Sequence, residues 1–219
     1  MKNRFIFGMT MFLILSTYQI QDNFKITSKF NIKKVLIENN DIVEKRDINK
    51  KISFLYKSNL IFFKKEELQK KLNQIDLIES YEIKKVYPDK IKIKIFEKKP
   101  IAIIQNKKYK SFYTANGSTA KFSYIKKYAK LPIVFGDKDS FKIFYNNLKS
   151  INFSIEEIEK FYLFESNRWD LETIENQTIK LPIKDYKESL KNFLSIKNQD
   201  KFKKYKIFDY RIKNQLILK

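Results

Sequence analysis

The chain has 219 residues, 43% of them hydrophobic and 16% aromatic, which is enough to form one medium-sized domain or two small ones. Glycine occurs 3 times and proline 4 times, so the composition excludes long flexible linkers and low-complexity tails. Cysteine and histidine are both absent, which excludes disulfides, the usual zinc sites and Ser-His or Cys-His triads. We therefore expect no catalytic residue, no metal site and no cofactor.

The formal net charge of +21 raises the question of a nucleic-acid partner. Of the 46 basic residues four are arginines, at positions 4, 46, 168 and 211, which leaves 42 lysines. Proteins that grip phosphate or read bases rely on the planar, bidentate guanidinium of arginine. Because the lysines are spread along the whole chain, they are typical of a solvated surface, and we expect no nucleic-acid partner. Attraction to an anionic membrane surface is the alternative role for these lysines.

The first segment is an apolar run preceded by positive charge. Lys2 and Arg4 are followed by residues 5–21, which carry no charge before Asp22. About 17–20 apolar residues can span a bilayer, and basic residues before them place that end in the cytoplasm. The run lacks a good small-x-small cleavage site, so it predicts an uncleaved anchor over residues 1–22 and export of the rest. A cleaved signal peptide and a buried helix of a soluble protein are the alternatives.

The next segment has the periodicity of a small mixed domain, in the order strand, helix, helix, strand, strand. Ile91, Ile93 and Ile95 alternate with other residues in the manner of a half-buried strand, after a turn signal at residues 87–90. The expected elements are strands at 30–37, 78–86 and 91–96 and helices at 43–56 and 65–73.

After residue 97 the sequence changes to short strands separated by turns, with two helical segments. The expected strands are 102–104, 109–113, 131–136, 158–164, 169–173, 178–181, 207–212 and 215–219, and the expected helices are 141–151 and 186–196. The fold class is therefore α+β, with a mixed domain at 29–97 and a β-rich domain with flanking helices at 98–219.

Four motifs, in this order, resemble the FtsQ/DivIB family of cell-division proteins. The most specific lies in residues 86–102, where Val-Tyr-Pro-Asp-Lys-Ile is followed by Glu-Lys-Lys-Pro-Ile-Ala. The others are Leu-Pro-Ile-Val-Phe-Gly at 131–136, the strand pair at 168–171 and 178–181, and Phe-Asp-Tyr-Arg at 208–211. The chain departs from the family at Pro182, which replaces a glycine, and at 176–177, where Asn-Gln replaces an Asn-Gly turn.

The resemblance implies a single-pass inner-membrane protein with a cytoplasmic stub and transmembrane helix, a POTRA domain of order β-α-α-β-β, and an FtsQ-type β domain. Both domains would be periplasmic and located at the division septum. The implied function is a scaffold that binds and recruits other divisome proteins, among them proteins of the FtsB and FtsL type.

The expected partner site is the last strand, because a terminal edge strand exposes unpaired N–H and C=O groups to which another strand can add. The resemblance implies that Arg211 pairs there with a partner carboxylate and that Arg168 is a second basic contact. The strand contacts carried over from the family are Ile212, Asn214, Leu216 and Leu218. The alternative is that Arg211 forms an internal salt bridge and that the leucines belong to the core.

An alternative from a different class is a membrane-anchored serine protease of the signal-peptidase type with a Ser-Lys dyad. It would use Ser28 as nucleophile and Lys33 or Lys34 as base, although no glycine-rich strained segment surrounds Ser28. A POTRA chaperone that feeds an outer-membrane barrel is a third possibility, but the chain lacks a series of barrel strands of about ten residues.

Overall fold

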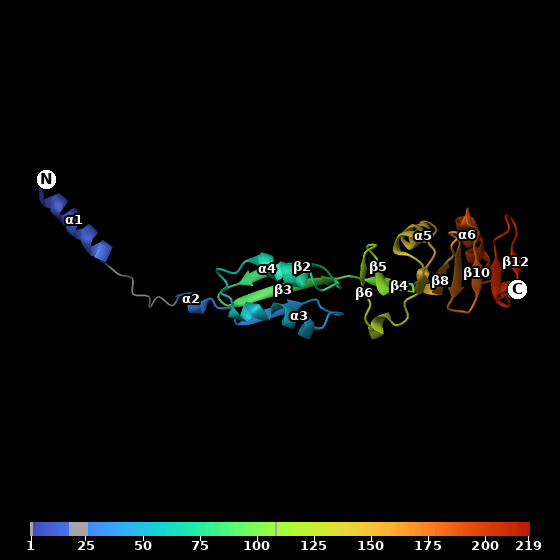
Figure 1. Cartoon of the computed structure of the whole chain (residues 1–219), viewed down its shortest axis with the longest axis horizontal. Helices are drawn as coiled ribbons and strands as arrows, with labels where there is room; N and C mark the ends of the chain where they lie inside the picture. The colour runs from blue at the N-terminus through green and yellow to red at the C-terminus, as the bar shows by residue number, and fades with distance from the viewer. Residues whose placement is uncertain (1, 18–25, 108) are drawn as a thin grey trace. The chain divides into compact units, whose positions relative to one another are not determined.

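The computed structural model describes residues 2–17, 26–107 and 109–219 and places them in two compact units, Met1–Phe96 and Glu97–Lys219 (Figure 1). Helix α1 (Lys2–Thr17) occupies much of the expected anchor, and residues 18–22 of that anchor lie outside the described residues. None of the helices in the described residues combines the length and the apolar character that a bilayer crossing requires. The expected transmembrane helix is therefore not confirmed.

The first unit has the expected order of a small mixed domain. Its three-stranded sheet has the order β1-β3-β2, and β1 is parallel to the central strand β3. Its elements after α1 are α2 (Ile26–Lys29), β1 (Lys34–Glu38), α3 (Lys45–Ile52), the 3-10 helix η1 (Ser53–Lys57), α4 (Lys65–Leu72), β2 (Ile78–Val86) and β3 (Lys90–Glu97).

One face of β3 forms the core of the first unit. The alternating Ile91, Ile93 and Ile95 are fully buried, as the sequence predicts. They pack in one cluster with residues of α3 and with Leu68 and Leu72 of α4, which share a helix face because they are four residues apart. Burying each such side chain contributes roughly 1.5–3 kcal/mol to folding stability, so this face of β3 stabilises the unit.

The second unit is built on a nine-stranded sheet with the order β12-β11-β10-β9-β8-β7-β4-β5-β6. Strand β12 is therefore one edge of the sheet and β6 the other. Its elements are β4 (Pro100–Gln105), β5 (Lys110–Thr114), β6 (Thr119–Lys121), η2 (Lys126–Tyr128), β7 (Ile133–Phe135), α5 (Lys138–Ser150), η3 (Ile155–Glu157), β8 (Ile158–Leu163), β9 (Trp169–Thr173), β10 (Thr178–Lys180), α6 (Tyr186–Ile196), α7 (Asp200–Lys203), β11 (Ile207–Asp209) and β12 (Ile217–Leu218).

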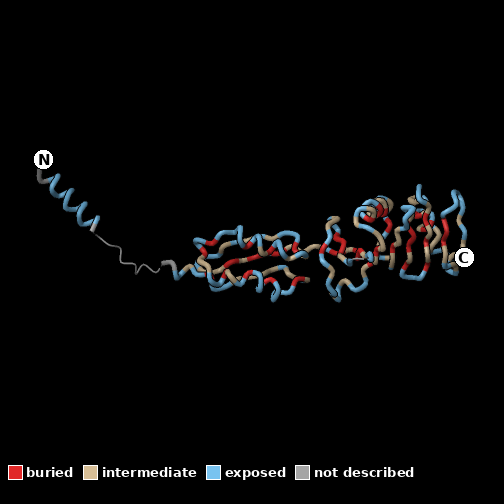
Figure 2. The backbone as a smooth tube through the Cα atoms, viewed as in Figure 1, coloured by how far each residue is buried: buried red, intermediate tan, exposed pale blue. Residues whose placement is uncertain are grey.

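A row of apolar side chains crosses this sheet on the face that α5 and α6 cover. The register aligns Phe161, Leu171, Ile179 and Phe208 on four neighbouring strands, and all four are fully buried. Phe208 packs edge-on against Phe193 of α6, with ring centroids 5.0 Å apart. The two helices lie on the same side of the sheet in Figure 1, and Figure 2 marks buried segments along the strands of this sheet.

The expected α+β architecture is confirmed, and β2, β9 and α6 begin and end at the predicted residues. The predictions for the last two strands were too long, since β11 ends at Asp209 and β12 comprises two residues. The reason is local: the Asp209 carboxylate accepts a hydrogen bond from the backbone N–H of Arg211 (3.1 Å), which turns the chain. Asn214 then adopts a left-handed conformation, with φ of 59°, in the loop that returns to β12.

Candidate functional site

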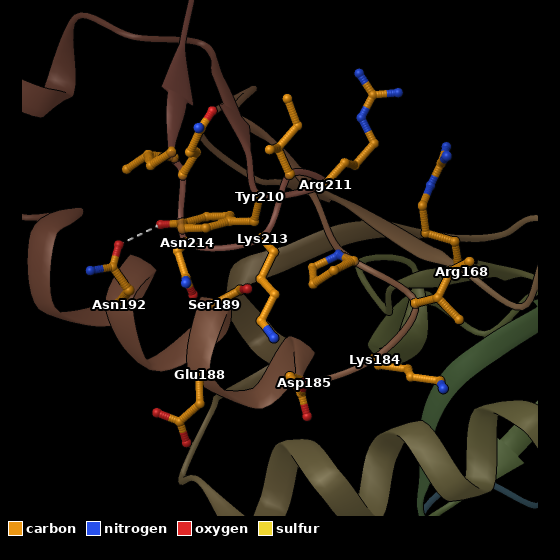
Figure 3. Close-up of a pocket in the computed structure, with 15 residues that line it drawn as sticks. Arg168, Lys184, Asp185, Glu188, Ser189, Asn192, Tyr210, Arg211, Lys213 and Asn214 are labelled. Atoms are coloured by element: carbon orange, nitrogen blue, oxygen red, sulfur yellow. Dashed lines mark hydrogen bonds between the residues drawn. The ribbon is translucent and has the colours of Figure 1, made fainter.

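A groove of about 1010 Å³ lies beside the terminal edge of the nine-stranded sheet (Figure 3). Three segments form most of it, namely the loop before α6, one face of α6, and the connection from β11 to β12, and Arg168 is added from the turn before β9. They meet because β11 pairs with β10 in parallel, which requires α6 and α7 to cross over between them. The lining residues are Arg168, Pro182, Ile183, Lys184, Asp185, Glu188, Ser189, Asn192, Tyr210, Arg211, Ile212, Lys213, Asn214, Gln215 and Leu216.

Tyr210 forms a fixed wall of this groove. Its backbone N–H donates to the carbonyl of Lys180 (2.9 Å), and its hydroxyl donates to Oδ1 of Asn192 on α6 (2.9 Å, dashed in Figure 3). Burial raises the pKa of the Tyr210 phenol, so it stays protonated and keeps this hydrogen bond. The loop after β11 is thereby tied to both the sheet and the helix.

Arg211 pairs within the chain, with Asp209 two residues earlier. Its Nη2 lies 2.6 Å from Oδ2, and its Nε lies 2.9 Å from Oδ1. The hydrogen bond from Arg211, opposed by burial and assisted by the charge of Lys180, holds the pKa of the Asp209 carboxyl below its usual value. The Arg211 side chain is 45% exposed and that of Asp209 is 9% exposed, so the carboxylate is the sheltered partner. The alternative of an internal salt bridge therefore holds for Arg211.

Arg168, which directly precedes β9, repeats this arrangement with Asp170. Its Nε donates to Oδ1 of Asp170 (3.1 Å), and its guanidinium lies over the ring of Phe164, 4.3 Å from the centroid. The register places Asp170 beside Lys180 and Lys180 beside Asp209, so charges alternate across the sheet on the face away from α5 and α6. Figure 3 shows the two arginines pointing to the same side at one rim of the groove.

The two pairs leave guanidinium donors for another acceptor. An arginine has five N–H groups, and the bonds to Asp209 use the Nε and Nη2 of Arg211. Among the described residues, no other carboxylate lies within ion-pair distance of Arg211, so its Nη1 is available to an outside acceptor. The rim can thus bind a further carboxylate without breaking the internal pair.

The edge strand β12 presents backbone groups to solvent. Lys219 donates its N–H to the carbonyl of Ile207 (3.1 Å) and accepts from the Ile207 N–H (2.9 Å), so these two residues form a hydrogen-bonded pair. Because the pattern alternates along an antiparallel ladder, the N–H and C=O of Leu218 point away from the sheet. Leu218 therefore offers one donor and one acceptor to an added strand.

The groove brings together five of the six residues expected to bind a partner. Leu218 is the exception and lies on β12. Ile212, Asn214 and Leu216 are in the loop and not in a strand, which corrects the expectation that they are strand contacts. Ile212 is 51% exposed, whereas Leu216 and Leu218 pack partly against the core, so the alternative of a core role holds in part for the leucines.

The groove residues contributed by residues 182–192 were not expected from the sequence. Their approach to the last loop depends on the parallel pairing of β10 with β11, which is a long-range feature without a local signal. The one available signal was the Phe-Asp-Tyr-Arg motif, which contains Tyr210 but does not indicate its contact with Asn192.

The second unit thus has an open sheet edge, to which another strand can add, beside a groove rimmed by arginines. Residues 30–98 match the family model of the FtsQ-type POTRA domain, and residues 102–211 match that of the C-terminal region of cell division protein FtsQ/DivIB. The chain belongs to the FtsQ/DivIB family of cell-division proteins, as its motifs indicated. The match ends at Arg211, so residues 212–219 with β12 lie beyond it.

Individual relatives carry the same description. The chain is 26% identical over 215 residues to cell division protein FtsQ of Rickettsia conorii, covering 92% of this chain and 77% of that protein. It is 25% identical over 212 residues to FtsQ of Rickettsia typhi, covering 90% and 76%. Among solved structures, the major extracytoplasmic domain of DivIB from Geobacillus stearothermophilus, in its trans isomer, is similar with a TM-score of 0.34 and 12% identity, covering 47% of this chain and 92% of that one.

Membership of this family makes the chain a non-enzymatic cell-division scaffold. It is not an enzyme, and the serine-protease alternative built on Ser28 is wrong. No group of three or more Asp or Glu side chains in the described residues has the geometry of a metal site.

Proposed function

We propose that the chain is a single-pass inner-membrane scaffold of the divisome, with its amino terminus in the cytoplasm and its two domains in the periplasm at the septum. In this proposal residues 1–22 form the cytoplasmic stub and anchor, 29–97 the POTRA domain and 98–219 the FtsQ-type β domain. The anchor is supported by Lys2 and Arg4 before the uncharged run at 5–21, part of which is helix α1.

The scaffold would recruit proteins of the FtsB and FtsL type by adding a strand of the partner to β12. The observation that carries this proposal is the position of the groove, directly beside the open edge at Leu218. An added strand would bond to the Leu218 backbone while its side chains enter the groove. Four basic residues line the groove, Arg168, Lys184, Arg211 and Lys213, against the acidic Asp185 and Glu188, so an acidic partner segment fits best.

Two substitutions at Leu218 test whether a partner strand adds to this edge. One removes the backbone N–H, and the other shortens the side chain. Leu218→Pro removes the outward N–H without removing a hydrogen bond of the sheet, since proline is tolerated where an edge N–H faces solvent. Leu218→Ala keeps the N–H and shortens the side chain, so it is the matched control. We expect the proline variant to bind the partner about tenfold or more weakly than the alanine variant in calorimetry, because a partner carbonyl loses its donor. Equal affinities, with both variants folded by circular dichroism, would place the partner elsewhere.

The topology is tested by a reporter fused after Lys219. Alkaline phosphatase, which is active only after export, should be active in the full-length fusion, and a cytoplasmic fluorescent reporter should be dark. The mature protein should also retain Lys2 and Arg4. Fluorescence from the cytoplasmic reporter, or a mature amino terminus beyond Thr17, would contradict the proposed anchor.

A further inference from the structure

The first unit carries a dense group of lysines at one end of its sheet. Because β1 and β3 are parallel, Lys34 and Lys90 lie together at this end, and Glu38 lies beside Lys94 toward the other. Residues 28–34, 56–65 and 84–90 at the first end contain nine lysines and a single acidic residue, Asp89. This end of the unit is therefore strongly basic.

Backbone contacts join the three basic segments into one surface. Asn31 forms an antiparallel bridge with Asn59, and the N–H of Leu60 donates to the carbonyl of Phe30 (2.8 Å). The N–H of Lys33 donates to the carbonyl of Asp89 (2.9 Å), which joins the turn between β2 and β3 to the same end. The lysines at 29, 33, 34, 57, 64, 65 and 84 are exposed on it, and those at 85 and 90 are partly exposed.

Large apolar side chains stand among these lysines. Phe62 is 70% exposed and Tyr87 is 61% exposed, and Tyr56 and Ile61 are also exposed. Tyr87 packs edge-on against Phe30, and Nζ of Lys85 lies 3.5 Å from the carbonyl of Ile61, so these groups belong to one patch. We call this surface, formed by residues 28–34, 56–65 and 84–90, the lysine–aromatic patch.

We propose that the lysine–aromatic patch rests on the anionic headgroups of the membrane and orients the POTRA domain there. The inference rests on the proposed function, which places a membrane anchor at residues 1–22. Twelve residues separate Thr17 from Phe30, so Phe30 lies at most about 45 Å from the end of α1.

The chemistry of the patch favours a lipid surface over other anions. Lysine attracts headgroups as a point charge, while exposed aromatic rings occupy the boundary between headgroups and acyl chains. A nucleic acid would satisfy the lysines, but it leaves Phe62 and Ile61 without an apolar environment.

The test uses the chain from residue 26 to 219, which lacks the anchor. Among the described residues, neither hydrophobic core contains one before Phe30, so the cores that the structure shows are retained in this protein. We expect it to sediment with vesicles that contain phosphatidylglycerol and not with vesicles of pure phosphatidylcholine. The binding should weaken as salt is raised, because exposed charges are screened.

Two triple variants of equal charge separate the patch from a general effect of net charge. Lys33→Gln, Lys57→Gln and Lys64→Gln together should weaken vesicle binding on the order of a hundredfold, since each lysine near an anionic surface is worth about fivefold. Lys45→Gln, Lys70→Gln and Lys71→Gln, away from the patch, should leave it nearly unchanged. Phe62→Ser should weaken binding about fivefold, an effect that electrostatics alone would not produce.

Equal losses in the two triple variants would overturn the inference, and so would unchanged binding in Phe62→Ser. Binding to duplex DNA that needs the patch lysines but not Phe62, without vesicle binding, would assign the patch to nucleic acid. These results are independent of the reporter at Lys219: if that reporter shows export and vesicles do not bind, the inference fails while the proposed topology stands. A cytoplasmic reporter would contradict the proposed function itself.

Discussion

Arg211 forms an internal ion pair and also lines the groove. Its hydrogen bonds favour the ionised form of the sheltered Asp209, and the proposed function gives it a second role, in partner binding. Reversing its charge would place a second carboxylate beside Asp209 and disturb the edge whether or not a partner binds there. A substitution that keeps the positive charge is therefore the better probe of partner binding.

Arg211→Lys should weaken partner binding about tenfold and leave folding nearly intact. Lysine can still neutralise Asp209, but its ammonium lacks the planar fork that bonds to two carboxylates at once. Arg46→Lys is the matched control, because Arg46 is exposed on α3 and far along the chain from the groove. Calorimetry with the partner gives the affinities. If both variants bind like the wild type, Arg211 acts on Asp209 alone.

The lowered pKa of Asp209 predicts how the stability of the second unit depends on pH. Its folded-state pKa is lowered, chiefly by the hydrogen bond from Arg211, so its contribution to stability is present above the unfolded pKa and is lost as the pH falls through the folded value. Asp209→Asn should therefore cost about 1–2 kcal/mol at pH 7 and progressively less below about pH 4.

Denaturant unfolding at pH 7, 4 and 3 measures this difference. Glu165→Gln, in an exposed turn of the same unit, serves as the control and should change little at any pH. A penalty for Asp209→Asn that stays constant down to pH 3 would mean that the carboxylate charge does not stabilise the folded state.

At the scale of elements, Gly136 determines how closely β7 and β8 can pack. A Cβ added at this position would lie 3.0 Å from Cβ of Leu163 and 3.4 Å from the ring of Trp169. Gly136→Ala should therefore destabilise the second unit by about 1–3 kcal/mol. In a Leu163→Gly background the same change should cost less, since the Cβ that the added methyl group would meet at 3.0 Å is absent. Additive penalties in denaturant unfolding would contradict the steric explanation.

The sequence could predict those helices and strands that show their own periodic spacing of apolar residues. Ile91, Ile93 and Ile95 alternate because one face of β3 is buried, and α6 shows its helical spacing through Leu190 and Phe193. Strand ends and edges are different, because pairing between distant segments decides them. Strand β6 was not expected for this reason, and the groove depends on the pairing of β10 with β11.

At the scale of the whole molecule, the two separate cores predict that a core substitution in one unit destabilises that unit and not the other. Ile93 is fully buried in the first unit, and no residue of the second unit belongs to its cluster. Ile93→Ala should destabilise the first unit by about 2–5 kcal/mol. Partner binding at the groove should be unchanged under conditions in which the second unit remains folded.

Thermal unfolding monitored by circular dichroism, together with calorimetry, checks this prediction. Phe208→Ala is the reciprocal variant, since Phe208 lies in the core of the second unit, and it should reduce partner binding. If Ile93→Ala also abolished partner binding, the two units would depend on each other for folding or for function.

The shortness of β12 limits how strongly copies of the protein can associate through this edge. Within β12, Leu218 alone directs its backbone groups outward, so two copies that met edge to edge would share few hydrogen bonds. Each such bond contributes about 1 kcal/mol, whereas association costs roughly 4–15 kcal/mol. At high local concentration, the molecules should therefore not polymerise through this edge. A ligand that also occupies the adjoining groove gains the additional contact that a second copy lacks, which makes the edge selective.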